Sequence, residues 1–263
     1  MSAPSLFTPF PGRVITVGST DRANILLIQK QLNQQGCGPI AEDGNFGPET
    51  LEAVSLFQAR STDSRGLPLA IDGRVGPMSW AVLFRVDTVA VQAPPTALSA
   101  GALNVARDQL GVLEQPPGSN SGPLVNQYLA SVNTPPGNPW CAAFVYWCFD
   151  QAATALNVPN PAIRTAGALD IWNEAGKHGA HRIACAEAAD VPGLVQPGMV
   201  FVISTGGGHG HVGLVESIDG VVLTTIEGNT NAGGSREGIG VFRHQGRRIA
   251  QISCGFVDFT QPA

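Results

Sequence analysis

The sequence has no apolar run that approaches the about 18 residues needed by a membrane-spanning helix, so we expect no membrane span. Positive charge is scarce as well: 15 Lys and Arg stand against 20 Asp and Glu, and the net charge of −5 argues against nucleic acid as a partner. The five cysteines are irregularly spaced, which does not predict a disulfide framework. The opening residues, MSAP, lack the basic start and apolar core of a secretory signal. We therefore expect synthesis and folding in a reducing cytoplasm without a cleaved signal peptide.

The chain does contain enough apolar material for packed cores, at 43% hydrophobic residues, and its 263 residues suit two domains. A proline-rich segment, QAPPT at 92–96, predicts a linker. The N-terminal residues carry several prolines and are expected to form a poorly ordered arm. We therefore expect an arm at 1–19, a small domain at 20–86, the linker at 87–99 and a larger domain at 100–263.

The most informative stretch is NPWCAAFVYWC at 138–148, which predicts a buried helix with a cysteine in its first turn. Asn138 suits the N-cap, and Pro139 suits the first helical position. Cys141 would then lie among unpaired backbone N–H groups at the positive end of the helix dipole, which favours the nucleophilic thiolate. Cys148 lies deeper in the apolar run and is interpreted as a core residue. The other three cysteines have no base or metal-ligand partner at a diagnostic spacing and are interpreted as structural: Cys37, Cys185 and Cys254.

A base for such a thiolate follows in the segment GHGHVGLV at 208–215. His211 opens a predicted strand, Asp-Gly at 219–220 is a hairpin turn signal, and a second strand returns to Glu227. A hairpin of this length brings Glu227 near His211, where it could fix the tautomer of the imidazole. Asn229 lies two residues further and would share a face with Glu227 if the chain stays extended. Taken alone, a Cys in an apolar helix or a lone His is more often structural, but the combination is more specific.

These motifs resemble those of CHAP domains, which are cysteine, histidine-dependent amidohydrolases or peptidases related in fold to NlpC/P60 and papain-like enzymes. The similarity runs from about residue 100 to residue 259 and is carried by PWCAAFV at 139–145, GHVGLV at 210–215 and IEGNTN at 226–231. The resemblance implies Cys141 as the nucleophile, His211 as the general base and Glu227 as the residue that orients the imidazole. It implies Asn229 as a further polar member of the site, with His209 as the nearest competitor for the role of base.

A second signal lies upstream, where DGNFGPET at 43–50 is followed 29 residues later by DGRVGPMSW at 72–80. Each copy predicts a tight turn and then a helix that begins at its proline. A further amphipathic helix is expected before them, over 24–35. The pattern resembles the peptidoglycan-binding domain 1 family, a small three-helix module, over about residues 20–86. The alternative is an ordinary three-helix spacer. Because the chain is acidic, such a module would bind the wall by specific contacts.

For the larger domain we expect an α+β, papain-like fold in which helices precede an antiparallel sheet. The cleft is expected where the Cys141 helix meets the sheet edge that bears His211. The glycine-rich segments at 205–210 and 231–235 are expected either to form its rims or to be plain flexible loops. The predicted helices are 103–110, 123–131 and 141–156, and the predicted strands are 199–204, 211–218, 221–226, 238–244 and 249–259.

No cofactor and no metal are expected. The CHAP resemblance allows for calcium on an acidic loop before the nucleophile, but residues 131–140 here contain no Asp or Glu. The asparagines of this region alone would make a poor site for a cation that prefers carboxylates.

Together the two resemblances imply a peptidoglycan hydrolase that cuts amide bonds in or next to the stem peptide, as an N-acetylmuramoyl-L-alanine amidase or an endopeptidase. We expect a monomer, exported to the periplasm as a phage endolysin or as an antibacterial effector of a type VI-like secretion machine. The effector route would add a cognate immunity protein or a secretion apparatus as partners. One alternative is a catalytically silent peptidoglycan-binding protein, against which the complete set of Cys141, His211 and Glu227 argues. A cysteine protease acting on proteins is another, which the wall-binding module disfavours.

Overall fold

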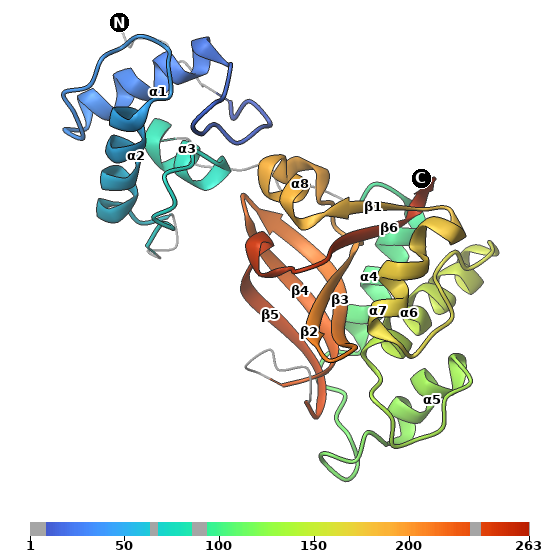
Figure 1. The fold of residues 1–263 in the computed structure, drawn as a ribbon. Coiled ribbons are helices and arrows are strands. Elements are labelled where there is room, and N and C mark those ends of the chain that lie inside the picture. The colour runs from blue at the N-terminus through green and yellow to red at the C-terminus, as the bar shows by residue number, and fades with distance from the viewer. Residues whose placement is uncertain (1–8, 64–67, 86–93, 232–237, 263) are drawn as a thin grey trace, which may run out of the picture. The chain divides into compact units, whose positions relative to one another are not determined.

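The computed structural model describes residues 9–63, 68–85, 94–231 and 238–262. Their contacts divide the chain into two compact units, one built mainly from residues before 86 and the other mainly from residues after 93 (Figure 1). Each unit has its own cluster of buried hydrophobic residues. No helix within the described ranges is long and apolar enough to cross a membrane.

The N-terminal unit contains three helices, α1 (Arg22–Gln34), α2 (Pro48–Arg60) and α3 (Pro77–Phe84). The side chain of Asp21 caps α1 by accepting from the backbone N–H of Asn24 at 3.2 Å. Both later helices begin at their proline, which costs no hydrogen bond in the first turn. The predicted three-helix organisation is therefore confirmed.

The two repeats are held by a pair of buried glutamines that the sequence analysis missed, Gln29 on α1 and Gln58 on α2. Each amide lies beneath one Asp-Gly turn, donates to its aspartate and accepts from the backbone N–H of its glycine. Gln29 Nε2 lies 2.9 Å from Asp43 Oδ1, and Gln58 Nε2 lies 2.8 Å from Asp72 Oδ1. The glutamines are 29 residues apart, like the turns, so the repeat includes a helix and the turn that packs on it.

The N-terminal unit begins earlier than the arm predicted at 1–19 allows. Ile15 is 2% exposed and exchanges two backbone hydrogen bonds with Val75, of 3.1 and 2.8 Å. Residues 1–8 of that arm lie outside the described residues, as do residue 86 of the predicted small domain and 87–93 of the predicted linker. The rest of the linker is partly helical, because Thr96 and Ser99 form a capping box that starts α4 at Ala97.

The second unit has the predicted α+β organisation, with most helices before an antiparallel sheet. The sheet has six strands in the order β1-β6-β2-β3-β4-β5. The helices are α4 (Ala97–Asp108), α5 (Pro123–Ser131), α6 (Cys141–Leu156), α7 (Ala168–Glu174) and α8 (Cys185–Asp190). The strands are β1 (Ala180–Ala184), β2 (Val200–Gly206), β3 (His209–Asp219), β4 (Val222–Thr230), β5 (Gly240–Arg248) and β6 (Gly255–Pro262). The described residues after 93 also include three short 3₁₀ helices: η1 (Ala175–His178), η2 (Pro192–Leu194) and η3 (Ile249–Gln251).

Helices α5 and α6 have the predicted bounds, whereas α7, α8 and β1 were not predicted. The single strand predicted over 249–259 is wrong in its first part, because η3 comes first and β6 starts only at Gly255. The predicted helix 103–110 begins six residues earlier, at the Thr96 cap. The other four strands each end one to four residues later than predicted, while β2, β4 and β5 also begin one or two residues later and β3 begins two residues earlier.

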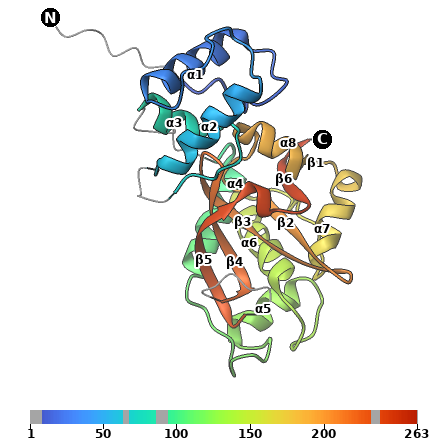
Figure 2. The same cartoon turned by 60° about the vertical axis from the view of Figure 1, so that its left-hand side comes forward.

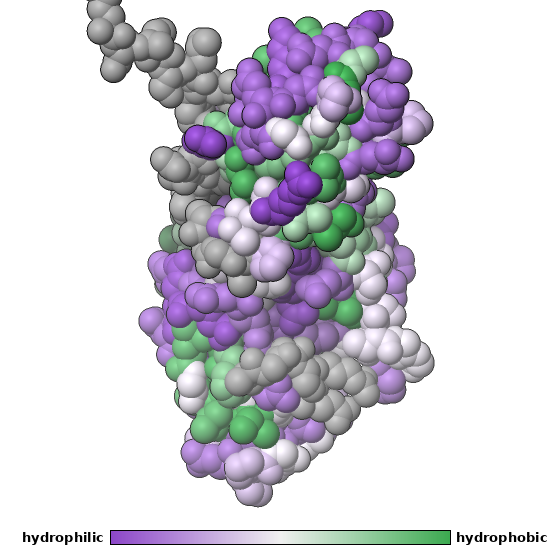
Figure 3. Space-filling model, turned by 90° about the vertical axis from the view of Figure 1, so that its left-hand side faces the viewer, coloured by the Kyte–Doolittle hydropathy of each residue, from purple (hydrophilic) through white to green (hydrophobic). Residues whose placement is uncertain are grey.

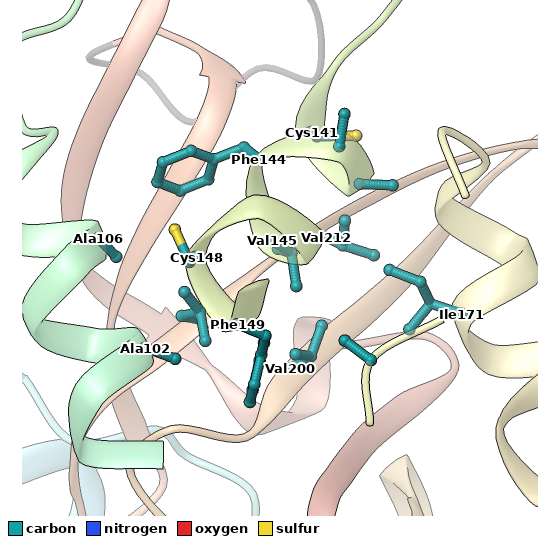
Figure 4. Packing of buried hydrophobic residues seen from close by; sticks show 14 of the residues in the cluster. Ala102, Ala106, Cys141, Phe144, Val145, Cys148, Phe149, Ile171, Val200 and Val212 are labelled. Carbon is teal, nitrogen blue, oxygen red and sulfur yellow. The ribbon is translucent and has the colours of Figure 1, made fainter. Parts of the chain in front are cut away.

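Helix α6 is the centre of this unit, with α4 on one side and the sheet on the other (Figures 1 and 2). A Cβ added at Gly101 of α4 would lie only 3.0 Å from Ala152 Cβ of α6, so small residues allow the two helices to approach closely. Figure 4 shows the contact from nearby, with the start of α6 at Cys141 and with Cys148 further along among apolar side chains. The residues packed there include Ala102, Ala106, Phe144, Val145, Phe149, Val200 and Val212.

Candidate active site

Cys141 is the first residue of α6, and its side chain is 4% exposed. The predicted cap is wrong in detail: Trp140 occupies the N-cap position without a side-chain cap, and the Asn138 amide instead donates to the Pro135 carbonyl at 3.0 Å. The first-turn N–H groups of α6 therefore have no side-chain acceptor at the cap. This leaves the positive end of the helix dipole beside the thiol, as the sequence predicted.

The beginning of α6 is fixed by Trp140, which is fully buried. Its indole Nε1 donates to Glu114 Oε1 at 2.9 Å, and Glu114 is itself 1% exposed. On the other side lies Gly228, where an added Cβ would stand 2.7 Å from Trp140 Cζ3 and 2.8 Å from Phe144 Cβ. The glycine between Glu227 and Asn229 thus permits α6 to pack directly on β4. Sequence reasoning missed Trp140 and Glu114, although the tryptophan stands next to the cysteine.

His211 and Glu227 meet in the interior, as the hairpin argument predicted. His211 Nε2 lies 2.7 Å from Glu227 Oε2, and the two side chains are 3% and 0% exposed. The strands that carry them are β3 and β4, joined by a two-residue turn at 220–221, one residue after the predicted 219–220. His211 is not on a sheet edge as predicted, because β3 lies between β2 and β4 and the edge strands are β1 and β5.

Two buried polar side-chain atoms in the described residues have no hydrogen-bond partner, His211 Nδ1 and Asn229 Oδ1. Both belong to the site predicted from the sequence. Buried polar atoms are nearly always paired, so an unpaired one calls for an explanation such as a site for a substrate or a water. Because Glu227 occupies Nε2, Nδ1 is the ring nitrogen left for the thiol of Cys141.

The pKa of His211 reflects this arrangement. Burial alone would lower the pKa of the ring, but the nearby Cys141, together with the hydrogen bond and negative charge of Glu227, raises it to about 9. The imidazolium form is therefore favoured at neutral pH, next to a thiol at a helix N-terminus.

Glu227 is a carboxylate whose oxygens are both saturated with donors. Burial would raise the pKa of its carboxyl, yet the hydrogen bond and charge of His211 and the charge of Arg247 bring that pKa below its usual value. Thr225 Oγ1 donates to Oε1 at 2.5 Å, and Arg247 binds both oxygens, Nε to Oε1 and Nη2 to Oε2, each at 2.9 Å. Glu227 is thus held as an anion that can orient the imidazole.

Arg247 and the nearby His244 were not found from the sequence. His244 pairs with Thr225 across the ladder and Arg247 with Leu223, and the register shifts between them. Gly246, at φ 93°, is the extra residue on β5. Residues three apart on a regular strand point to opposite faces, so this bulge brings both side chains to the Glu227 face. His244 Nε2 lies 4.0 Å from Glu227 Oε2, and burial lowers the pKa of His244.

Asn229 is 2% exposed, but the assumption of an extended chain fails there. Its φ is 52°, in the left-handed region that Asn tolerates, and the β4–β5 register is irregular between Glu227 and Thr230. The expectation that Asn229 shares a strand face with Glu227 is therefore wrong, although the residue remains buried at the end of β4.

The competing residues lie elsewhere. His209 is exposed at the start of β3, whereas His211 is the histidine bonded to Glu227. Cys148 is fully buried, and burial raises the pKa of its thiol, which suits a core residue. All five cysteines are free. Of the two predicted rims, 205–210 forms the β2–β3 connection with three consecutive glycines at positive φ, and 232–235 of the other lies outside the described residues.

Two protein-family models match the chain. The CHAP domain family matches residues 133–229, a range that holds all four predicted site residues, and the family described as putative peptidoglycan binding domain matches residues 21–83. Neither a curated protein nor a solved structure matches the chain. The predicted pair of domains is confirmed: a CHAP domain follows an N-terminal peptidoglycan-binding domain, the composition of a cell-wall hydrolase with a binding module.

Proposed function

We propose that this protein hydrolyses an amide bond in or next to the stem peptide of bacterial peptidoglycan, with Cys141 as the nucleophile. The observation that carries the proposal is the buried His211, bonded to Glu227 through Nε2 and left with an unpaired Nδ1 beside Cys141. A nucleophile, a base and a group that orients the base form the minimal unit of covalent acyl transfer.

In the proposed reaction the Cys141 thiolate attacks the amide carbonyl carbon, and first-turn N–H groups of α6 stabilise the oxyanion. The imidazolium of His211 gives its proton to the leaving nitrogen as the C–N bond breaks, which leaves a thioester on Cys141. Water then attacks the thioester, and its proton passes to His211. The C–S bond breaks, the acid is released, and the thiolate–imidazolium pair is restored.

Glu227 acts through His211 in this scheme, because its carboxylate holds the ring orientation and stabilises the cation. Asn229 supplies a buried amide at the same site, and its unpaired Oδ1 is available to a substrate N–H or to a water. The target bond is that of an N-acetylmuramoyl-L-alanine amidase or of an endopeptidase. An amidase would free the lactyl end of the glycan strand, and an endopeptidase would expose new amino-acid termini.

We also propose that the protein is delivered to the periplasm, where peptidoglycan lies. A phage endolysin released through membrane pores and an antibacterial effector of a type VI-like secretion machine both fit a wall hydrolase with its own binding module. The effector route predicts a cognate immunity protein in the producing cell.

Digestion of purified sacculi, followed by mass spectrometry of the released fragments, tests the reaction. We expect soluble fragments from the natural protein and none from Cys141→Ala, and the new termini identify the bond. Binding of sacculi with no release by either protein would support the catalytically silent alternative and overturn the proposal.

A further inference from the structure

Arg247 contacts both Glu227 and the ring of Phe201. Its guanidinium binds Glu227 with two hydrogen bonds of 2.9 Å, and its side chain is 15% exposed against 0% for the carboxylate. The guanidinium also lies over the ring of Phe201, 5.1 Å from its centroid, and that ring is 6.0 Å from the ring of His211. A bidentate pair of this kind fixes the plane of the carboxylate as well as its charge.

Glu227 is thus shared between two cations. Oε1 accepts from Thr225 and from Arg247 Nε, and Oε2 accepts from Arg247 Nη2 and lies against His211 Nε2. Each of the four donors constrains the carboxylate, but only His211 and Arg247 carry charge. The attraction between Glu227 and each cation is pairwise and persists, but the Arg247 guanidinium also repels the imidazolium, so His211 is stabilised less as a cation than it would be beside Glu227 alone.

The titratable and charged side chains recorded around this group come from four elements. They are Cys141 on α6, His211 on β3, Glu227 on β4, and His244 and Arg247 on β5. Around the Glu227 carboxylate, the Arg247 guanidinium and the His211 imidazolium are positive, and the lowered pKa of His244 favours its neutral form.

We propose that Arg247 is a positioning residue of the catalytic site, which locks Glu227 in the plane that orients His211 and balances its charge. Arg247 touches no reacting atom and acts through Glu227. The proposal rests on the proposed function for its effect on hydrolysis, but its effect on the titration of His211 does not depend on any substrate.

The same strand offers a matched control in Arg243. Its guanidinium binds Glu216 with two hydrogen bonds of 2.6 and 2.9 Å, but with 40% of its side chain exposed. The surface is mainly hydrophilic on the side of the molecule where the edge strand β5 lies (Figure 3). Arg243→Met therefore removes an arginine–glutamate pair of the same kind from the same strand, away from His211.

The experiment compares Arg247→Met, Arg247→Lys, Arg243→Met and the natural protein. Circular dichroism checks the fold, NMR follows the titration of His211 and His244, and muropeptide release gives kcat and KM. In Arg247→Met we expect the midpoints of both histidines to rise, that of His211 by about one pH unit, because a nearby positive charge is lost. We expect kcat to fall about tenfold or more with KM within about threefold, since Arg247 does not contact substrate.

Arg247→Lys keeps the positive charge without the bidentate contact. The titration midpoints of His211 and His244 should therefore lie close to their natural values, and part of kcat should be recovered. Arg243→Met should match the natural protein in both readouts. Unchanged His211 titration and unchanged kcat in folded Arg247→Met would overturn the proposal. If Arg247→Met does not fold, Arg247→Lys decides. A natural kcat in Arg247→Lys would overturn the proposal, whereas a reduced kcat with a natural titration midpoint of His211 would support it. If no variant or natural protein hydrolyses sacculi, the proposed function fails, while the titration still decides the role of Arg247.

Discussion

Gly228 and Trp140 are in such close contact that a Cβ on the glycine would stand 2.7 Å from the indole ring. This contact connects the two halves of the candidate site, because Trp140 precedes the proposed nucleophile and Gly228 follows Glu227. The absence of a side chain at Gly228 therefore determines how closely α6 packs on β4. The sequence motif contained this glycine, but its role became visible only in the packed structure.

We expect Gly228→Ala to push the start of α6 away from β4. Overpacking of this kind costs about 1–3 kcal/mol of the free energy of unfolding, and hydrolysis should fall further than that loss of stability accounts for, since a small misplacement of reacting groups is costly. Thermal unfolding and rates on soluble muropeptide measure the two effects. Gly111→Ala serves as a control, because no atom lies within 4 Å of the added Cβ, although its φ of 85° still adds local strain. Full activity in folded Gly228→Ala would contradict the proposed packing requirement.

The two cysteines of α6 should separate chemistry from packing. Cys141→Ala should leave a folded protein without detectable hydrolysis, while Cys148→Ala should keep activity and lose about 1 kcal/mol of stability through a small cavity. At neutral pH, iodoacetamide should modify Cys141 first, because burial raises the pKa of Cys148 and shields it. Peptide mapping gives the order, and faster labelling of Cys148 would reject the assignment.

The histidines should show a similar contrast. His211→Ala should lose as much activity as Cys141→Ala, because residues that act as one catalytic unit have non-additive effects when they are replaced. His209→Ala should retain most activity, since that side chain is exposed and Glu227 is bonded to His211. Glu227→Gln should be intermediate, because the ring can still be held while its cation loses a negative neighbour. The opposite ranking of the two histidines in a muropeptide-release assay would move the base to His209.

The sequence predicted those parts of the site that depend on local signals. Helix α6 has its predicted bounds, the turn between β3 and β4 lies one residue after the predicted 219–220, and the hairpin brings Glu227 to His211. The extended path through Asn229 was wrong, because a bulge and a left-handed residue end the regular ladder there. Such irregularities depend on packing between strands and have no period in the sequence.

What the sequence did not predict depends on contacts between distant segments. Arg247 binds Glu227, 20 residues away in the sequence, only because Gly246 shifts the register of β5. The sequence around Arg247 therefore does not predict that its partner is Glu227. Ile15 likewise joins the N-terminal unit through Val75, 60 residues away, although its proline-rich surroundings suggested an arm. Gln29 and Gln58 resemble ordinary helix residues until the turns they hold are packed over them.

The raised pKa of His211 predicts a pH profile with a defined alkaline limit. Because the folded value of about 9 lies above the ordinary value of 6.5, the imidazolium contributes stability that is full below pH 6.5 and is lost as the pH rises through 9. Activity should fall over the same alkaline range, since the proton needed by the leaving nitrogen is lost. Glu227→Gln should move this limb to lower pH. A natural protein whose activity declines already near pH 6.5 would contradict the raised pKa.

The last prediction concerns the division of work between the two domains. Deletion of residues 1–91 should leave cleavage of soluble muropeptide intact, because every proposed catalytic residue lies in the CHAP-containing unit and α4 begins only at Ala97. Cleavage of intact sacculi should fall, because a tethered binding module raises the local concentration of the enzyme at an insoluble polymer. The isolated N-terminal module should sediment with sacculi without degrading them. Equal activity of the truncated and full chains on sacculi, with the module left in the supernatant, would remove the targeting role and leave the catalytic proposal standing, since the two depend on different residues.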